Sequence, residues 1–266
     1  MSDEALGQVS RSAAESYHEF FVPALFQEWA PRVAQAAAIR PGHRVLDVAC
    51  GTGALTREIA ARVAPGGAVV GLDPNAGMLE RARRRGTGIE WREGAGEALP
   101  FDGESFDAVV SQFGLMFFRD RCGAIREMAR VLRSAGRLAV AVWDSIARSP
   151  GYAALADLLL ELFGRDAAEA LRAPFALGER PALLALFTEA GLPDARVVTL
   201  PGAARFPSLE SWLFTEVKGW VLADRIDDVQ YARLLASAGE KLRAFVTPRG
   251  SVAFDAPAHI VTATRG

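Results

Sequence analysis

The sequence predicts an α/β protein with a Rossmann-like, doubly wound sheet, mostly parallel with an antiparallel last strand, plus helical cap insertions. Three observations support this class. Short apolar runs alternate with helical stretches between residues 43 and 143, which is typical of a parallel sheet covered on both faces. A glycine-rich turn follows the first of these runs. The 266 residues are 50% apolar, enough for the core of one large domain.

The N-terminal part is expected to be helical over residues 5–38. Apolar residues recur at three- and four-residue steps after Pro23, which we expect to open a helix because proline is tolerated at the first position. Pro41 and Gly42 then end this helical region.

The middle of the chain supplies the core elements. Strands are expected at His43–Val48, Ala68–Leu72, Gly88–Glu93, Phe106–Ser111 and Arg137–Val142. Helices are expected between them at Ala54–Val63, Asn75–Arg85 and Arg119–Leu132.

Beyond residue 143 the alternation loosens, and we expect two helical additions that meet over one end of the sheet. The expected elements are a helical stretch over 144–180, a helix at Pro181–Ala190, a strand at Ala195–Leu200, helices near Leu209–Leu222 and Asp227–Val246, and a final strand at Gly250–Thr264 bent at Pro257. The resulting segments are N-terminal helices over the ligand site (1–40), the binding core (41–143), an insertion (144–180), a core helix and strand (181–201), a second insertion (202–249) and the final core strand (250–266).

Charge and composition exclude several classes of protein. Thirty basic and 32 acidic side chains give a net charge of −2, so no basic excess favours nucleic acid as a partner. The one dense basic run, Arg81–Arg85, is interpreted as the last turn of a helix. Two cysteines, an acidic N-terminus and the lack of a long apolar run favour a cytoplasmic protein without a membrane span.

The strongest local signal is the stretch Val45–Gly53, in which a buried strand runs into a glycine-rich turn and a helix follows. Gly51 and Gly53 allow a tight turn and a close approach by a ligand. Asp73 ends the next strand, 20 residues beyond Gly53, where a carboxylate can accept hydrogen bonds from both hydroxyls of a ribose. Together these residues predict an adenosine-type ligand across the ends of the first two strands.

A dinucleotide remains an alternative at this point, although two features argue against it. The dinucleotide fingerprint needs a third glycine, and that position holds Thr56. The fingerprint also gives no reason for Asp47 before the glycines. A carboxylate there suits a ligand with a positively charged amino group better than a pyrophosphate.

These motifs resemble those of the class I S-adenosylmethionine-dependent methyltransferases, in particular the small-molecule group that includes the ubiquinone and menaquinone biosynthesis C-methyltransferases. The resemblance covers residues 15–143 and is vague over 144–250. The matching stretches are Val45–Gly53, Gly71–Leu79, Glu97–Phe101, Ser105–Asp107, Ser111–Phe118 and Arg130–Leu138.

The resemblance implies a role for each motif residue. The backbone of Ala49, Gly51 and Gly53 would hold the methionine part of the cofactor, with Asp47 near its ammonium group and Asp73 on the ribose. The other implied contacts are Pro74 and Met78 on the adenine, Gly96 and Glu97 at the adenine edge, Ser111, Gln112 and Phe113 on the methionine side, and Tyr17 as an aromatic lid. The product would be S-adenosylhomocysteine.

One position departs from the family pattern. Many relatives carry aspartate where this chain has Ala95, and its carboxylate accepts from the adenine amino group. Either backbone contacts suffice here or Glu97 substitutes. A lost contact of this kind would weaken cofactor binding by ~1–3 kcal/mol.

Other reactive side chains have simpler interpretations. Cys50 is interpreted as a small buried residue, and Glu216 and Lys218 as solvated charges. The three histidines are too dispersed for a metal site, so no metal is expected. Among them, His18 is the candidate general base, because a family-like N-terminal helix would bring it near the methyl group.

The expected partner is a small methyl acceptor, apolar or aromatic because tryptophan and other aromatic residues gather at and beyond the fifth strand. Helices of this kind also form dimer contacts, so a homodimer stays open. Two alternative functions also stay open, an NAD(P)-dependent reductase and a non-catalytic S-adenosylmethionine-binding protein.

Overall fold

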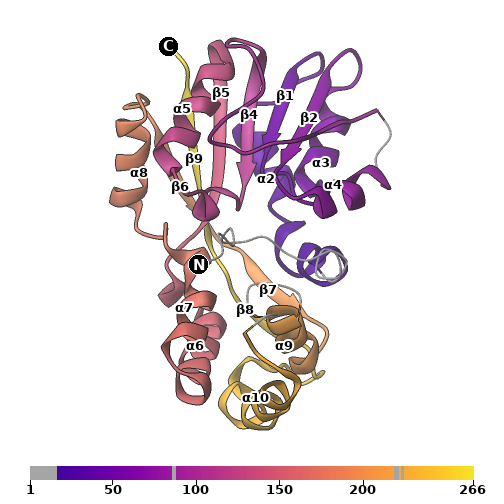
Figure 1. The fold of residues 1–266 in the computed structure, drawn as a ribbon, viewed down its shortest axis with the longest axis vertical. Coiled ribbons are helices and arrows are strands. Elements are labelled where there is room, and N and C mark those ends of the chain that lie inside the picture. Colours follow the sequence, from indigo (N-terminus) through magenta and orange to yellow (C-terminus); the bar gives the residue numbers. More distant parts are fainter. Residues whose placement is uncertain (1–16, 86–87, 219–221, 223–224) are drawn as a thin grey trace.

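The computed structural model describes residues 17–85, 88–218, 222 and 225–266, except for the side chains of residues 17–21 and 218. Two lobes are visible, one built on a large sheet and one mostly helical (Figure 1). No helix in these ranges is long and apolar enough to cross a membrane.

The large sheet has seven strands in the order β3-β2-β1-β4-β5-β9-β6. Only β9 runs antiparallel to its neighbours, so the expected mostly parallel sheet with an antiparallel last strand is confirmed. The strands are β1 (Arg44–Val48), β2 (Ala68–Asp73), β3 (Glu90–Glu93), β4 (Phe106–Gln112), β5 (Leu132–Trp143), β6 (Arg196–Leu200) and β9 (Ala258–Thr264). The central strands read as apolar runs because helices cover both of their faces.

The helices are distributed over the two faces by the direction in which the chain crosses the sheet. It moves one way from β1 to β2 to β3 and the opposite way from β4 to β5. Right-handed crossovers therefore place α3 and α4 on one face and α5 on the other. The covering helices are α2 (Ala30–Ala36), α3 (Ala54–Val63), α4 (Ala76–Arg83), α5 (Arg121–Val131) and α8 (Arg180–Glu189). The reversal between β1 and β4 opens a crevice at the carboxyl ends of these strands.

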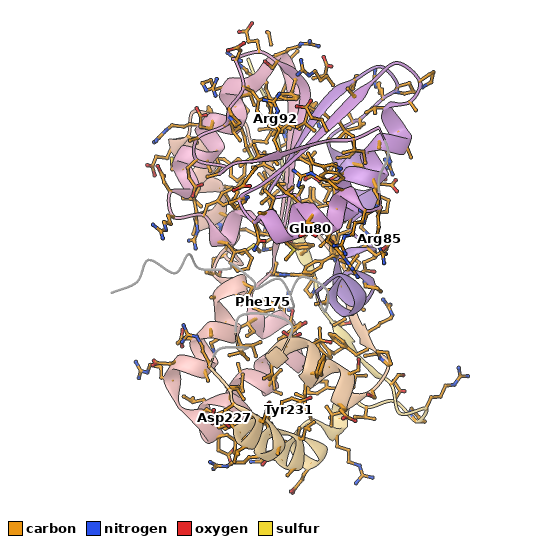
Figure 2. All side chains as sticks on the ribbon, turned by 45° about the vertical axis from the view of Figure 1, so that its right-hand side comes forward. Glu80, Arg85, Arg92, Phe175, Asp227 and Tyr231 are labelled. Carbon is orange, nitrogen blue, oxygen red and sulfur yellow. The ribbon has the colours of Figure 1, made fainter. Side chains whose placement is uncertain are left out.

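The second lobe, called the cap below, lies beyond the carboxyl end of the sheet (Figure 1). It contains α6 (Pro150–Phe163), α7 (Arg165–Arg172), α9 (Leu209–Lys218), α10 (Asp228–Lys241) and a two-stranded sheet of β7 (Ala203–Phe206) and β8 (Val252–Asp255). Helix α10 packs against α6 and α9, so the two additions meet as expected. Figure 2 places Phe175 at the junction of the lobes and Tyr231 within the cap.

Two expectations about the cap and the last strand are wrong. Gly250–Thr264 forms two strands instead of one, because Ala256 and Pro257 separate β8 from β9. Strand β8 then pairs with β7, which was not expected at all, because a four-residue strand such as Ala203–Phe206 gives little alternation to recognise.

Pro23 lies inside the first helix and does not open it, contrary to expectation. This helix spans Tyr17–Phe26 and has the wide π geometry, with Gln27 N donating to Val22 O five residues earlier at 2.8 Å. A proline ring clashes with the carbonyl four residues before it in an α-helix, and a wider turn relieves that clash.

Candidate functional site

A cavity of about 430 Å³ opens where β1, β2 and β4 end, within the usual size range of small-molecule sites. It combines acidic groups and backbone from the strand ends with aromatic rings on the side toward the cap. Its lining residues include Val22, Phe26, Asp47, Ala49, Cys50, Gly51, Thr52, Asp73, Pro74, Asn75, Met78, Ala95, Gly96, Glu97, Gln112, Phe113, Gly114, Phe117, Phe118, Arg119 and Trp143.

The glycine-rich loop after β1 forms one wall. Gly51 and Gly53 have left-handed backbone angles, with φ of 54° and 81°, which glycine adopts without the steric cost that other residues meet. Gly53 N donates to Cys50 O at 2.9 Å, and Cys50 N donates to Leu72 O at 3.0 Å. These bonds hold the loop against the end of β2 and leave its other side open to the cavity.

Asp47, near the end of β1, is almost fully buried, and one of its two carboxylate oxygens is hydrogen-bonded. Its Oδ2 accepts from the Thr56 hydroxyl at 2.6 Å, while Oδ1 has no hydrogen-bond partner among the described residues. Burial raises the pKa of Asp47 to about 7, and the nearby Asp73 adds to the rise. An unpartnered carboxylate oxygen in a cavity wall suits a positively charged donor such as an ammonium group.

Thr56 explains why this chain departs from the dinucleotide fingerprint. The hydroxyl that replaces the third glycine lies in the first turn of α3, is fully buried, and holds the Asp47 carboxyl group in place. The sequence showed that a glycine was missing there but not what the threonine does.

Asp73 ends β2 and joins two segments of the cavity wall. Its Oδ2 accepts from Gly51 N and its Oδ1 from Asn75 N, both at 2.8 Å. Burial raises its pKa to about 6, and the two backbone hydrogen bonds oppose that rise. A carboxylate has about four acceptor positions, so both oxygens retain capacity for hydroxyl donors.

The wall next to Asp73 is less polar. Pro74, Met78 and Gly96 line it, and the Asn75 side chain caps α4 by accepting from Met78 N at 3.1 Å. Glu97, which was considered as a substitute for the missing aspartate at position 95, accepts through Oε1 from Arg119 N at 3.0 Å. One of its oxygens is therefore already committed to the loop beyond β4.

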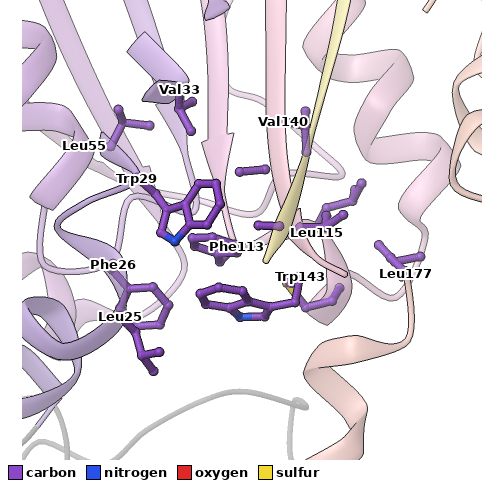
Figure 3. Packing of buried hydrophobic residues seen from close by; sticks show 14 of the residues in the cluster. Leu25, Phe26, Trp29, Val33, Leu55, Phe113, Leu115, Val140, Trp143 and Leu177 are labelled. Carbon is purple, nitrogen blue, oxygen red and sulfur yellow. The ribbon is translucent and has the colours of Figure 1, made fainter. Parts of the chain in front are cut away.

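An aromatic cluster forms the wall toward the cap, and Figure 3 shows its rings together. Phe113 and Trp143 are stacked with ring centres 3.9 Å apart, and Phe26 lies 5.5 Å from Phe113. Phe113 has φ of 55°, which is strained for a bulky residue. The stacking over Trp143, with Trp29 at its edge, stabilises that conformation beside the cavity.

Most of the residues predicted for the site come together in this one cavity. Those that line it are Asp47, Ala49, Gly51, Asp73, Pro74, Met78, Gly96, Glu97, Gln112 and Phe113. Gly53 and Ser111 lie behind the wall, and Ser111 is fully buried. The side chains of Tyr17 and His18 lie outside the described part of the structure.

Sequence reasoning missed two of the residues that line the cavity from the N-terminal helix. Val22 and Phe26 are both buried at its wall. Gln112 Nε2 donates to Phe26 O at 3.2 Å and connects this helix to β4. An apolar residue in a helix gives no sequence signal that separates a ligand contact from ordinary core packing.

Several other side chains have structural roles. Burial raises the pKa of the Cys50 thiol well above its usual value, which disfavours a nucleophilic thiolate. His259 bridges Thr199 and the carbonyl of Gly178, each at 2.9 Å. In the basic run 81–85, Arg84 forms an ion pair with Glu80 at 2.7 Å. No group of three or more acidic, histidine or cysteine side chains in the described ranges is arranged to hold a metal ion.

Glu216 is not solvated, contrary to expectation. It is 1% exposed within the cap and accepts from the Tyr152 hydroxyl at 2.7 Å. Burial raises its pKa to about 8. The expectation of a solvated Glu216 is wrong because the two helical additions fold onto each other over this position.

Comparisons with known proteins agree with this geometry. The methyltransferase domain family matches residues 46–140. The ubiquinone/menaquinone biosynthesis C-methyltransferase UbiE of Pseudomonas paraeruginosa is 34% identical over 172 residues, which cover 60% of this chain and 67% of that protein. The chain belongs to the class I S-adenosylmethionine-dependent methyltransferases.

Other relatives of this chain match over less of their length. UbiE of Hahella chejuensis is 43% identical over 118 residues, covering 42% of this chain and 47% of that protein. UbiE of Xanthomonas campestris is 37% identical over 53% of this chain and 59% of its own length. The chain thus spans about half the length of these curated relatives.

Solved structures support the fold. The YcgJ protein of Bacillus subtilis superposes with a TM-score of 0.59 at 18% identity, covering 90% of this chain and 98% of that chain. Phosphoethanolamine N-methyltransferase 2 of Haemonchus contortus, solved with S-adenosylhomocysteine, gives a TM-score of 0.61 at 15% identity, covering 96% and 57%.

The cavity fits the cofactor that this family implies. The unpartnered Oδ1 of Asp47 matches the ammonium group of S-adenosylmethionine. The Asp73 carboxyl group matches the ribose hydroxyls, and the surface of Pro74 and Met78 matches the adenine ring.

Proposed function

We propose that this protein transfers a methyl group from S-adenosylmethionine to a small apolar or aromatic molecule. The observation that carries this proposal is the single cavity in which two buried carboxyl groups, Asp47 and Asp73, face an aromatic wall formed by Phe26, Phe113 and Trp143. The carboxyl groups suit the cofactor, and the rings suit an acceptor of low polarity.

In this proposal Asp47 holds the ammonium group of the cofactor and Asp73 its ribose. The backbone at Ala49 and Gly51 contacts the methionine part, with Gly53 shaping the loop from behind. The remaining roles are Pro74 and Met78 on the adenine face, Gly96 and Glu97 at the adenine edge, Gln112 and Phe113 on the methionine side with Ser111 beneath them, and Tyr17 over the cofactor.

When bound, the cofactor supplies an activated methyl group on a sulfonium, which is a good leaving group. The residues of the chain align the cofactor and exclude water. The aromatic wall keeps water away from the reacting atoms, and the hydrogen bonds of Asp73 to Gly51 and Asn75 fix the loops that position the cofactor. His18 is the proposed general base for an acceptor that must lose a proton.

The acceptor is proposed from the wall that it would contact. Aromatic rings offer stacking and apolar contact, and a net charge of −2 gives no attraction for nucleic acid. Because the curated relatives carry the name C-methyltransferase, an aromatic carbon is the first acceptor atom to test.

The experiment is a methyl-transfer assay with S-adenosylmethionine labelled in its methyl group. Purified protein is incubated with a panel of phenols, quinols, amines and carboxylic acids, and label is followed into the acceptor. We expect transfer to at least one aromatic member, and loss of that transfer in Asp73→Ala. Cofactor binding without transfer to any class in the panel would favour a non-catalytic binding protein.

A further inference from the structure

Trp91 lies in an unusual place, on the short edge strand β3 behind the glycine-rich loop. Asp47 is in register with Gly71, and Gly71 is in register with Trp91. Directly paired residues of parallel strands point to the same face of the sheet. Asp47, Gly71 and Trp91 therefore form a row across three strands, on the face that α3 covers.

The indole ring of Trp91 fills the space that two glycines leave. A methyl group on Gly71 would lie 2.6 Å from both Cε3 and Cζ3 of Trp91. A methyl group on Gly53 would collide with Cη2 at the far end of the same ring. The ring thus lies across β2 and supports the loop at Gly53, the residue just before α3.

The same hollow has two further occupants. Cys50 Sγ would lie 3.0 Å from a methyl group on Gly71, and Arg57 Nη1 donates to Thr52 O at 2.8 Å. The loop from Cys50 to Gly53 is therefore held from behind by an aromatic ring and a guanidinium group, while its opposite side lines the cavity.

We propose that Trp91 is a positioning residue for the cofactor, because it holds the glycine-rich loop in its binding conformation before the cofactor arrives. Such preorganisation raises affinity by removing the entropy cost of ordering the loop on binding. The inference rests on the proposed function for the identity of the ligand, but the support of the loop by Trp91 exists without any ligand.

A shorter ring at position 91 distinguishes a positioning role from simple packing, because the indole reaches Gly53 through its far end. A phenyl ring at position 91 still covers Gly71, but it is too short to reach the place of Cη2 beside Gly53. Trp91→Phe thus keeps the contact across β2 and removes the contact with the loop. The indole Nε1 of Trp91 is buried without a hydrogen-bond partner among the described residues. The substitution therefore leaves no other group without its hydrogen bond.

The experiment compares wild type, Trp91→Phe and a matched control, Trp212→Phe. Trp212 is a tryptophan of the cap that does not line the cavity. Amide hydrogen exchange of residues 50–57 is measured in the free protein, and S-adenosylhomocysteine binding is measured by calorimetry. For Trp91→Phe we expect faster exchange confined to the loop and a Kd raised about tenfold. The control is expected to change neither quantity.

Unchanged loop exchange in Trp91→Phe would overturn the inference, and so would faster exchange spread over the whole sheet, which would indicate a packing role alone. Failure of the wild type to bind S-adenosylhomocysteine would count against the proposed function, and the exchange measurement would still decide the role of Trp91. If Trp91→Phe does not fold, exchange of residues 50–57 in the wild type decides instead: slow exchange in the free protein is expected, and protection that arises only with S-adenosylhomocysteine would overturn the inference.

Discussion

The sheet lobe and the cap both bury acidic side chains, but they surround them differently. Asp47 and Asp73 lie at the ends of adjacent strands, accept from a hydroxyl and from backbone N–H groups, and face a cavity. Glu216 lies among aromatic rings of the cap, where Tyr152 donates to it and Trp212 packs beside Tyr152. Burial raises the pKa of all three groups.

A raised pKa therefore does not by itself mark a functional acid. The two regions differ in whether a buried carboxyl group keeps a free acceptor oxygen in the wall of a cavity. Asp47 has an unpartnered oxygen in the cavity wall, whereas Glu216 does not line that cavity. We therefore assign Asp47 and Asp73 to ligand binding and Glu216 to the stability of the cap.

The largest expected effect that tests this assignment comes from Asp73→Ala. The substitution removes the acceptor proposed for two ribose hydroxyls and frees the N–H groups of Gly51 and Asn75. Hydrogen bonds to a charged group contribute about 1.5–3 kcal/mol each, so the Kd for S-adenosylhomocysteine should rise about 100-fold or more. Calorimetry provides the measurement, and Glu216→Gln is the control that should bind normally.

The next effect is a pH dependence of binding. Asp47 has a pKa of about 7 in the free protein, and an ammonium group beside it favours the ionised form. Binding below this pH therefore releases a proton, and affinity for S-adenosylhomocysteine should rise about tenfold between pH 6 and pH 8. Proton release is measured by calorimetry in buffers of different ionisation enthalpy. In Asp47→Asn both signals should shrink, and an unchanged pH profile there would refute the role of Asp47.

In the cap the expected effect is on stability. The pKa of Glu216 is raised from 4.5 to about 8 in the folded protein, so the folded state binds more protons than the unfolded state between these values. Stability from this group is fully present below pH 4.5 and is lost as the pH rises toward 8. Glu216→Gln should therefore raise the melting temperature more at pH 8.5 than at pH 5, by about 2–4 °C for each kcal/mol recovered. An equal shift at both pH values would contradict the assignment.

The smallest expected effect concerns the adenine edge of the cavity. Ala95 lines the cavity at the position where the family resemblance implies aspartate, and Glu97 accepts from Arg119 N through one oxygen. Ala95→Asp should lower the Kd for S-adenosylhomocysteine several-fold by adding an acceptor. Ala98→Asp adds the same charge at an exposed position outside the lining, and it should leave the Kd unchanged. Equal tightening in both variants would indicate a general charge effect.

The fold of the sheet lobe could be predicted from sequence because its central strands are buried on both faces and its turns carry glycine or proline. Val45–Gly53 combined both signals, and β1 and α3 follow them closely. The cap was less predictable. Strand β7 is short and pairs only with β8, so its formation depends on tertiary contacts that no local pattern encodes.

The candidate site also contains some residues that the sequence could predict and others that it could not. Asp47, Gly51 and Asp73 were predictable because their chemistry and spacing are specific to one edge of the sheet. Phe26 was not, since a buried aromatic in a helix resembles any core residue. Trp91 was not either, because its importance arises from the glycines at 53 and 71, which lie far from it along the chain.

The central claim, that this cavity is an S-adenosylmethionine site, is tested most directly by calorimetric titration of the wild-type protein with S-adenosylhomocysteine and, in parallel, with NADH. The account predicts saturable micromolar binding of S-adenosylhomocysteine and none of NADH. Binding of NADH alone to the folded protein would contradict it and would favour a reductase.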